Sequence, residues 1–252
     1  SYILPVDADN YITPYYIREA ATYLDAHPNV KVVSCEAIYC GDKSGLMHFV
    51  PFSLPMLARK NMIDNCAMYR KKDWEACGGY VEHIKGREDW VFWIAMFKSG
   101  GEFYRLPLPG FYYRVHANSK RKATKKLKRS LVKELNALYP EFFEATLQGP
   151  LHYHRSWSTW LNRCYHLLHP RKWKVSEDFK HLEIFVKSLP RLFKYNKGDV
   201  IYQGRNELRC FEMEGMHYVV KAFQIPHIIN RIVYGFMRKS KARRSYEHAQ
   251  LL

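Results

Sequence analysis

The feature that most constrains the fold is a helix that leads directly into a strand near the N-terminus. Thr13 suits the position before a helix, and Pro14 suits the first helical position because its missing N–H is not needed there. The helix is predicted over residues 15–26 and stops at the His-Pro-Asn sequence of residues 27–29. Residues 30–39 are rich in β-branched and aromatic side chains, which predicts a strand. This succession indicates an α/β fold.

Further short elements are predicted in two regions. In the first, strands are expected over residues 65–70, 102–106 and 110–115, and helices over 72–77 and 89–98, each ending at a pair of glycines. In the second, a helix over 177–188 precedes strands near 199–203, 207–212 and 217–223 and a basic helix from about 229. The segment between the regions is charged and helical. We therefore expect an α/β domain over 1–119, a basic helical linker over 120–174, and a small α+β unit over 175–252.

The composition suits a folded chain without a membrane span. Hydrophobic residues make up 47% of the sequence and aromatic residues 15%, which is enough to bury a core. No apolar run approaches the roughly 18–20 residues that cross a bilayer. The chain begins inside a strand-like apolar run, without a basic segment or cleavage site, so we expect a fragment of a longer protein. Its six cysteines are scattered and form no C-x-x-C, which predicts reduced thiols in a cytoplasmic protein.

Positive charge is concentrated in two runs. The net charge is +16, and the runs occupy residues 120–129 and 238–244. Such runs attract polyanions, namely nucleic acid, anionic lipid head groups or nucleotide phosphates, although a solvated helix face is the alternative. Aromatic residues do not interleave with either run as a base-stacking surface requires, so nucleic acid is not expected as a partner. Peripheral contact with the inner face of the cytoplasmic membrane fits the charge.

Two carboxylates follow the first apolar segment. Asp7 and Asp9 stand in an Asp-x-Asp sequence where a strand gives way to a loop, and ligands bind at such strand ends in α/β proteins. Hard divalent ions prefer oxygen ligands, and few carboxylates suffice where substrate phosphates supply the rest. Taken alone, the same pattern also fits a turn or a helix cap.

Four motifs in order resemble family 2 glycosyltransferases. The first is YILPVDADN at 2–10, followed by TPYYI at 13–17, and the second is CGGY at 77–80, which is similar to the family's GGYDE turn. The third is GREDWVFW at 86–93, similar to EDWDFW, and the fourth is FYYRVHANS at 111–119, similar to a closing YYR-x-H-x-x-S. The order and spacing make the combination far more specific than any one motif.

The resemblance implies a GT-A (Rossmann-like) fold and sugar transfer from a nucleotide-diphosphate donor. Asp7 and Asp9 would bind Mn²⁺ or Mg²⁺, and His116 is a further candidate metal ligand or diphosphate contact. Asp89 or Glu88 would be the base that takes the proton from the acceptor hydroxyl. The alternatives are an acidic helix cap at 88–89 and an ordinary surface histidine. The family's nucleotide-binding half precedes its Asp-x-Asp, so this chain corresponds to a C-terminal half.

The C-terminal region resembles a different enzyme class. Lys221 lies near the end of a β-branched strand, and Glu247 lies on the basic helix that follows. Kinases pair such residues to hold nucleotide phosphates, and residues 175–252 resemble the first lobe of lipopolysaccharide (Kdo/heptose) kinases. The resemblance implies ATP contacts at Lys221 and Glu247. A plain strand-end lysine is the alternative, and the sequence contains no full glycine-rich loop.

Three functional hypotheses follow. The first is a metal-dependent glycosyltransferase that acts on a cell-surface glycan or glycolipid, lipopolysaccharide or capsule, with a kinase-like unit attached. The second is a protein defined by its kinase-like region. The third is a non-catalytic basic protein that binds membrane or nucleic acid. The density of motifs favours the transferase.

Overall fold

A computed structural model describes residues 1–84, 86–116, 128–169, 173–204, 206–213, 215–223 and 241–249. The chain divides into two compact units, Ser1–Leu189 and Pro190–Leu252, which are described separately. Most of the first basic run, the end of the closing motif at 117–119, and the start of the predicted C-terminal basic helix at 229–240 lie outside the described residues.

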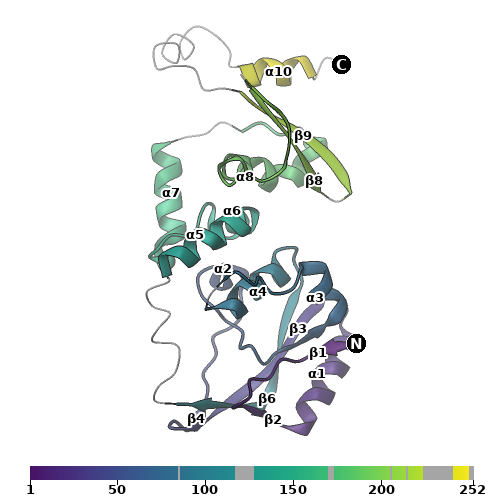
Figure 1. The fold of residues 1–252 in the computed structure, drawn as a ribbon, viewed down its shortest axis with the longest axis vertical. Helices are drawn as coiled ribbons and strands as arrows, with labels where there is room; N and C mark the ends of the chain where they lie inside the picture. Colours follow the sequence, from purple (N-terminus) through teal and green to yellow (C-terminus); the bar gives the residue numbers. More distant parts are fainter. Residues whose placement is uncertain are drawn as a thin grey trace. The chain divides into compact units, whose positions relative to one another are not determined.

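The first unit is built on a mixed six-stranded sheet (Figure 1). Its strands are β1 (Tyr2–Ile3), β2 (Tyr11–Ile12), β3 (Val30–Gly41), β4 (Gly45–Leu46), β5 (Met68–Arg70) and β6 (Glu102–Val115). The order is β1-β5-β3-β6-β2, with β4 paired to β3. The long central strands β3 and β6 are parallel, whereas the short strands pair antiparallel to their neighbours. The predicted α/β class is therefore confirmed as a mixed sheet with a parallel centre.

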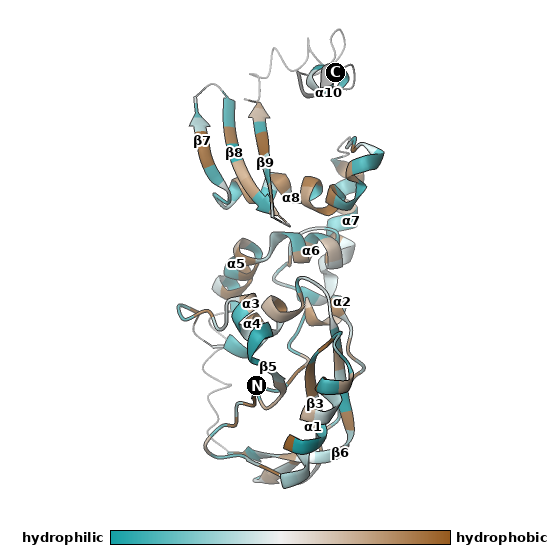
Figure 2. Cartoon of the chain, turned by 90° about the vertical axis from the view of Figure 1, so that its right-hand side faces the viewer, coloured by the Kyte–Doolittle hydropathy of each residue, from teal (hydrophilic) through white to brown (hydrophobic). Residues whose placement is uncertain are grey.

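Helices cover both faces of this sheet. Neighbouring residues of a strand point to opposite faces, and Val32 and Val33 accordingly belong to two separate hydrophobic clusters. Helix α1 (Pro14–Ala26) packs with Val33, and its Tyr16 hydroxyl donates to the backbone oxygens of Val33 and Cys66 at 3.3 and 3.0 Å. Helix α4 (Glu88–Phe97) packs with Val32 on the other face. Figure 2 shows the matching hydrophobic colour along β3.

Helix α4 is enclosed on all sides. Every residue from Trp90 to Phe97 is buried, the pattern of a helix without a solvent face. The helices around it are α2 (Leu54–Leu57), α3 (Lys71–Cys77), α5 (Lys128–Leu138) and α6 (Pro140–Leu147). The same hydrophobic cluster contains α4, Tyr139 between α5 and α6, and apolar residues of these two helices, which include Leu131, Leu135, Phe142, Phe143 and Leu147.

This packing differs from the predicted linker over 120–174. Apolar residues recur at helical spacing in α5 and α6, so these helices have a face to bury, and they bury it against α4. After them come a short 3-10 helix, η2 (Arg155–Trp157), and helix α7 (Ser158–Leu168). The compact unit continues through the 3-10 helix η3 (Glu177–Leu182) and ends within α8 (Glu183–Lys194). The unit boundary thus falls at 189/190, beyond both predicted boundaries.

The two strands predicted over 102–106 and 110–115 form one strand, β6. Pro107 and Pro109 were the reason to expect a break, because proline cannot donate a ladder hydrogen bond. The pairing of β6 with β3 continues past them through register shifts around Glu36. The interruption is a β-bulge rather than a strand end.

The second unit contains an antiparallel sheet. Strands β7 (Asp199–Gln203), β8 (Asn206–Met213) and β9 (Met216–Phe223) pair in sequence order, and α10 (Lys241–Ala249) follows. The buried guanidinium of Arg209 donates to the Lys197 backbone oxygen at 2.8 Å, which fixes β8 to the segment that follows α8, and to the Glu207 carboxylate within β8 at 2.7 Å. These strands match those predicted. Within the described parts of the chain, no helix is long and apolar enough to cross a bilayer.

Candidate functional site

The Asp7–Asp9 segment forms a tight turn where the chain leaves β1. The Asn10 backbone amide donates to the Asp7 backbone oxygen at 3.0 Å, and the Asn10 side-chain amide donates to the Asp7 carboxylate at 3.3 Å. The Asn10 side-chain oxygen in turn accepts the backbone amide of Arg114 at 2.8 Å. Both aspartate side chains are exposed. The turn is therefore fastened to the last residues of β6 while its carboxylates face solvent.

At the end of β6, residues of the fourth motif contact residues of the first motif. The Arg114 side chain donates to the backbone oxygen of Asp9 at 2.9 Å, and the His116 Nε2 atom lies 3.2 Å from the Asp9 Oδ2 atom. Asp9 and His116 are separated by 107 positions in the sequence. The contact lies at the carboxyl ends of the parallel strands β3 and β6, the edge of an α/β sheet at which ligands bind.

These residues offer two adjacent donors for a divalent ion. Among the described residues, no group of three or more His, Cys, Asp or Glu is arranged to hold a metal. Asp9 and His116 form a pair, and Asp7 lies in the same turn with its carboxylate facing the amides of Asn10 and Asn65. Such a donor set fits a Mn²⁺ or Mg²⁺ ion that takes its remaining ligands from phosphate and water. It does not fit a closed structural site.

Asp89 and Glu88, the two candidate bases, lie in different surroundings at the start of α4. Glu88 is exposed, and its carboxylate accepts the Gly86 backbone amide at 2.8 Å. Asp89 is partly buried; its Oδ2 atom accepts the Asn61 side-chain amide at 2.5 Å, and its Oδ1 atom accepts the Trp90 backbone amide at 2.8 Å. Burial raises the pKa of Asp89, against the opposing effect of the Arg87 guanidinium.

Both roles considered for Asp89 have a structural basis. The bond to the Trp90 amide is a contact that an acidic group makes at a helix N-terminus. The bond from Asn61 fixes the second oxygen, and the raised pKa suits a proton acceptor. Asn61 stands outside the four motifs, so no pattern in the sequence connects it with Asp89. Glu88 is exposed, and its carboxylate accepts the Gly86 backbone amide rather than a side-chain amide such as that of Asn61.

Asp64 is a further carboxylate here, and it lies outside the four sequence motifs. It is partly buried before β5, and its Oδ1 atom accepts the Cys66 backbone amide at 3.0 Å. Burial raises its pKa from 3.8 to about 6, and the negative charges of Asp89 and Asp7 add to the rise. Asp64 is thus close enough to both motif aspartates to sense them electrostatically. Its sequence surroundings indicate only the start of a strand.

A hydrogen-bonded chain joins the second motif to the first. The Tyr80 hydroxyl donates to the Asn65 side-chain oxygen at 3.2 Å, and the Asn65 amide donates to the Asp7 carboxylate at 3.4 Å. Burial raises the pKa of Tyr80, and the charges of Asp89 and Asp7 raise it further. Residues of the first three motifs therefore lie around three carboxylates, at Asp7, Asp64 and Asp89, and the fourth motif contacts Asp9 and Asn10 in the same turn as Asp7. We call this group of three the acidic cluster.

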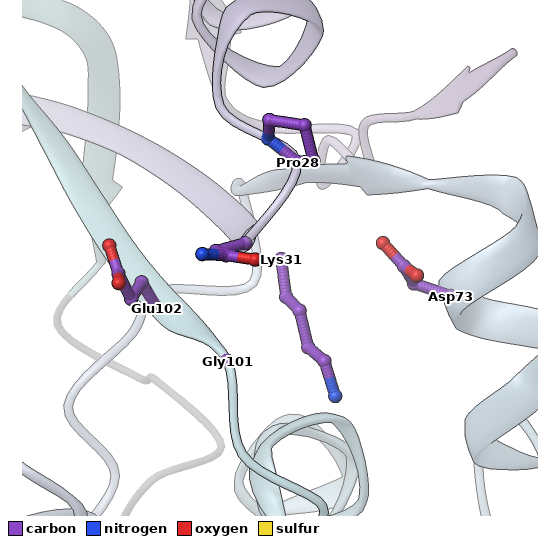
Figure 3. A pocket seen from close by; sticks show the side chains of 6 residues that line it. Pro28, Lys31, Asp73, Gly101 and Glu102 are labelled. Atoms are coloured by element: carbon purple, nitrogen blue, oxygen red, sulfur yellow. The ribbon is translucent and has the colours of Figure 1, made fainter.

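A separate hollow of about 410 Å³ lies away from the acidic cluster (Figure 3). Its lining includes Pro28, Lys31, Asp73 and Glu102, so it lies where β3 and β6 begin rather than where they end. The Lys31 ammonium donates to the Met96 backbone oxygen at 3.0 Å. Because ligands bind at the carboxyl ends of parallel strands, we do not assign the reaction to this hollow.

The predicted kinase-like pair makes other contacts in the second unit. The Lys221 ammonium lies 5.2 Å from the centre of the Phe223 ring on the same strand, and its side chain is exposed. Glu247 accepts the Arg243 side chain at 2.8 Å, one turn away within α10. These contacts provide no support for an ATP site, and the roles given to Lys221 and Glu247 remain predictions.

Comparison with known proteins gives a limited result. No protein-family model and no curated protein matches the sequence. Among solved structures, the chain is similar to the crystal structure of S. aureus TarS 1-349, with a TM-score of 0.40 and 14% identity. The match covers 90% of this chain and 72% of that one. Likeness at this level assigns no family, so the function is argued from the site.

Proposed function

We propose that this chain forms the acceptor-side part of a metal-dependent glycosyltransferase of the GT-A type. The donor would be a nucleotide-diphosphate sugar, and the acceptor a hydroxyl of a cell-surface glycan or glycolipid. The observation that carries the proposal is the convergence of four motifs, spread over more than a hundred residues, on one end of the sheet. The 3.2 Å contact between Asp9 and His116 is its clearest part.

Asp9, His116 and Asp7 are the residues that would hold the divalent ion. When bound, the ion would supply positive charge to the donor diphosphate and so favour its departure. The chain's own contribution is to hold these side chains in place. Arg114 holds the Asp9 backbone, and the Asn65 side-chain amide orients the Asp7 carboxylate.

Asp89 is the proposed base. Its carboxylate would take the proton of the acceptor hydroxyl while that oxygen forms a bond to the anomeric carbon. The bond between the anomeric carbon and the diphosphate oxygen breaks, and its electron pair leaves with the diphosphate. Asn61 holds one carboxylate oxygen in a fixed direction, and the raised pKa of Asp89 makes it a stronger proton acceptor once ionised. A positioned base of this kind contributes roughly 10²–10⁴ in rate.

The proposal is tested in an enzyme completed by a nucleotide-binding half ahead of this chain, by measuring transfer and donor hydrolysis with a panel of nucleotide-diphosphate sugars. Activity should require Mn²⁺ or Mg²⁺ and should disappear in EDTA. Asp9→Asn should abolish it while the far-UV circular dichroism spectrum stays unchanged. Undiminished turnover in EDTA would refute the metal role, and turnover that survives Asp9→Asn would refute the assignment of its ligands.

A further inference from the structure

Helix α7 buries polar residues and exposes apolar ones, the opposite of the usual arrangement for a helix on a protein surface. Ser158 and Asn162, one turn apart, are buried against the preceding segment. The Asn162 side-chain amide donates to the backbone oxygens of Leu147 and Pro150 at 3.0 Å each, and the Ser158 hydroxyl accepts the His152 backbone amide at 3.0 Å. The helix is therefore attached to its own unit through its polar side.

The opposite side of α7 presents large apolar residues to solvent. Trp157, at the N-cap, and Trp160 are 60% and 58% exposed, and Leu167 and Leu168 are 81% and 77% exposed. At 100° per residue, Trp160 and Leu167 point opposite Ser158 and Asn162, and Trp157 and Leu168 lie toward the edge of that side. We call these four residues the α7 apolar face. Soluble helices bury such a face, and a contiguous exposed one marks an interaction surface.

The charge around this face is of one sign. Residues 145–176 contain no Asp or Glu. The same stretch has four histidines and five basic residues, namely Arg155, Arg163, Arg171, Lys172 and Lys174. A second copy of the chain would bring like charges together, because a symmetric contact places the same patch on both sides. A negatively charged surface is the complementary partner.

The geometry of the aromatic residues favours lipid over nucleic acid. The Trp157 and Trp160 rings meet edge to face, with centroids 5.7 Å apart and an interplanar angle of 87°. They therefore do not offer the successive ring faces on which bases stack. Leu167 and Leu168 offer no stacking surface at all. Tryptophan and leucine bordered by basic residues are typical of helices that lie in the head-group region of a bilayer.

We propose that α7 docks the protein on an anionic lipid surface, with the α7 apolar face entering the boundary between head groups and acyl chains. The positive charge of residues 145–176, to which the exposed Arg163 contributes, would attract the lipid phosphates. This inference does not depend on the proposed reaction. It places the membrane contact on α7, whereas the sequence had suggested the basic runs at 120–129 and 238–244.

The test is flotation of the full chain with two kinds of vesicle, phosphatidylcholine alone and phosphatidylcholine with a third phosphatidylglycerol. The chain should float with the anionic vesicles, and less so as salt rises. The triple variant Trp160→Ser, Leu167→Ser, Leu168→Ser should bind them at least about tenfold more weakly. The control variant Leu46→Ser, Leu108→Ser removes exposed leucines elsewhere on the unit and should bind within about twofold of the parent chain. Circular dichroism melts establish that each variant is folded.

A second measurement locates the contact. Vesicles of brominated lipid should quench the tryptophan fluorescence of the parent chain. The variant Trp157→Phe, Trp160→Phe keeps an apolar face and should still float, but with most of that quenching lost. The proposal is overturned if the triple variant floats like the parent chain, or if the parent chain ignores anionic vesicles. Two other results would also overturn it, in each case if vesicles are not bound. One is an oligomer in light scattering that the triple variant loses, and the other is binding of a single-stranded oligonucleotide that the triple variant loses.

Discussion

Replacing Asp64 by asparagine should stabilise the first unit at neutral pH. The folded-state pKa of Asp64, about 6, lies above the ordinary value of 3.8, so folding takes up a proton between about pH 4 and pH 6. Above pH 6 the ionised carboxylate opposes folding. The full shift corresponds to about 3 kcal/mol, and partial exposure to solvent reduces the expected gain to about 2 kcal/mol. The side-chain oxygen of the introduced asparagine can still accept the Cys66 amide, so that bond is kept.

Urea denaturation followed by tryptophan fluorescence measures the free energy of unfolding of the first unit, which contains Asp64. All six tryptophans lie within residues 1–189, so the signal reports the first unit. The gain should be present at pH 7.5, should shrink as the pH falls from about 6 to 4, and should vanish below about pH 3, where Asp64 is protonated in both states. The exposed acid Glu82, changed to glutamine, is the matched control and should change stability by less than about 0.5 kcal/mol. Equal or lower stability of Asp64→Asn at pH 7.5 would refute the burial argument.

Three further predictions concern the core and the reaction. Phe143→Ala should lower the free energy of unfolding by roughly 3–5 kcal/mol because this side chain of α6 is fully buried. The control Phe179→Ala, at an exposed position, should change it by less than about 0.5 kcal/mol. Equal effects in urea denaturation would refute the packing of α6 into the first unit. Asp89→Asn should lower turnover by about 10²-fold with donor affinity nearly unchanged, and collapse of donor affinity with turnover preserved would make Asp89 a structural cap. Glu88→Gln should lower turnover by less than about threefold, and a loss like that of Asp89→Asn would move the base to Glu88.

Local signals in the sequence predicted the secondary structure well. Thr13-Pro14 marks the start of α1, and Gly78, which adopts a φ of 86°, ends α3 as expected of a residue in the left-handed region. Where prediction failed, a distant partner decided the outcome. Pro107 and Pro109 lie inside one strand because β3 continues to pair with β6 on both sides of them.

The candidate site was predicted in part. The motifs identified Asp9, His116 and Asp89, and the structure brings Asp9 and His116 together. No motif pointed to Asp64 or Asn61, because their roles arise from burial and from neighbours on other segments. The high charge of residues 120–129 likewise favoured a linker in the sequence. The apolar residues of α5 and α6 form part of the core because they pack against α4, which lies in a distant segment.

The most direct test of the central claim is the response of His116 to Mn²⁺ with uridine diphosphate, followed by proton nuclear magnetic resonance. The ring signal is assigned by its absence in His116→Gln. Because the imidazole lies against the Asp9 carboxylate, substoichiometric Mn²⁺ should broaden this signal strongly when the diphosphate is present. In Asp9→Asn, about tenfold more Mn²⁺ should be needed, since one of the few protein ligands is lost. A His116 signal that stays sharp, or that broadens equally in Asp9→Asn, would contradict a metal–diphosphate site at this end of the sheet.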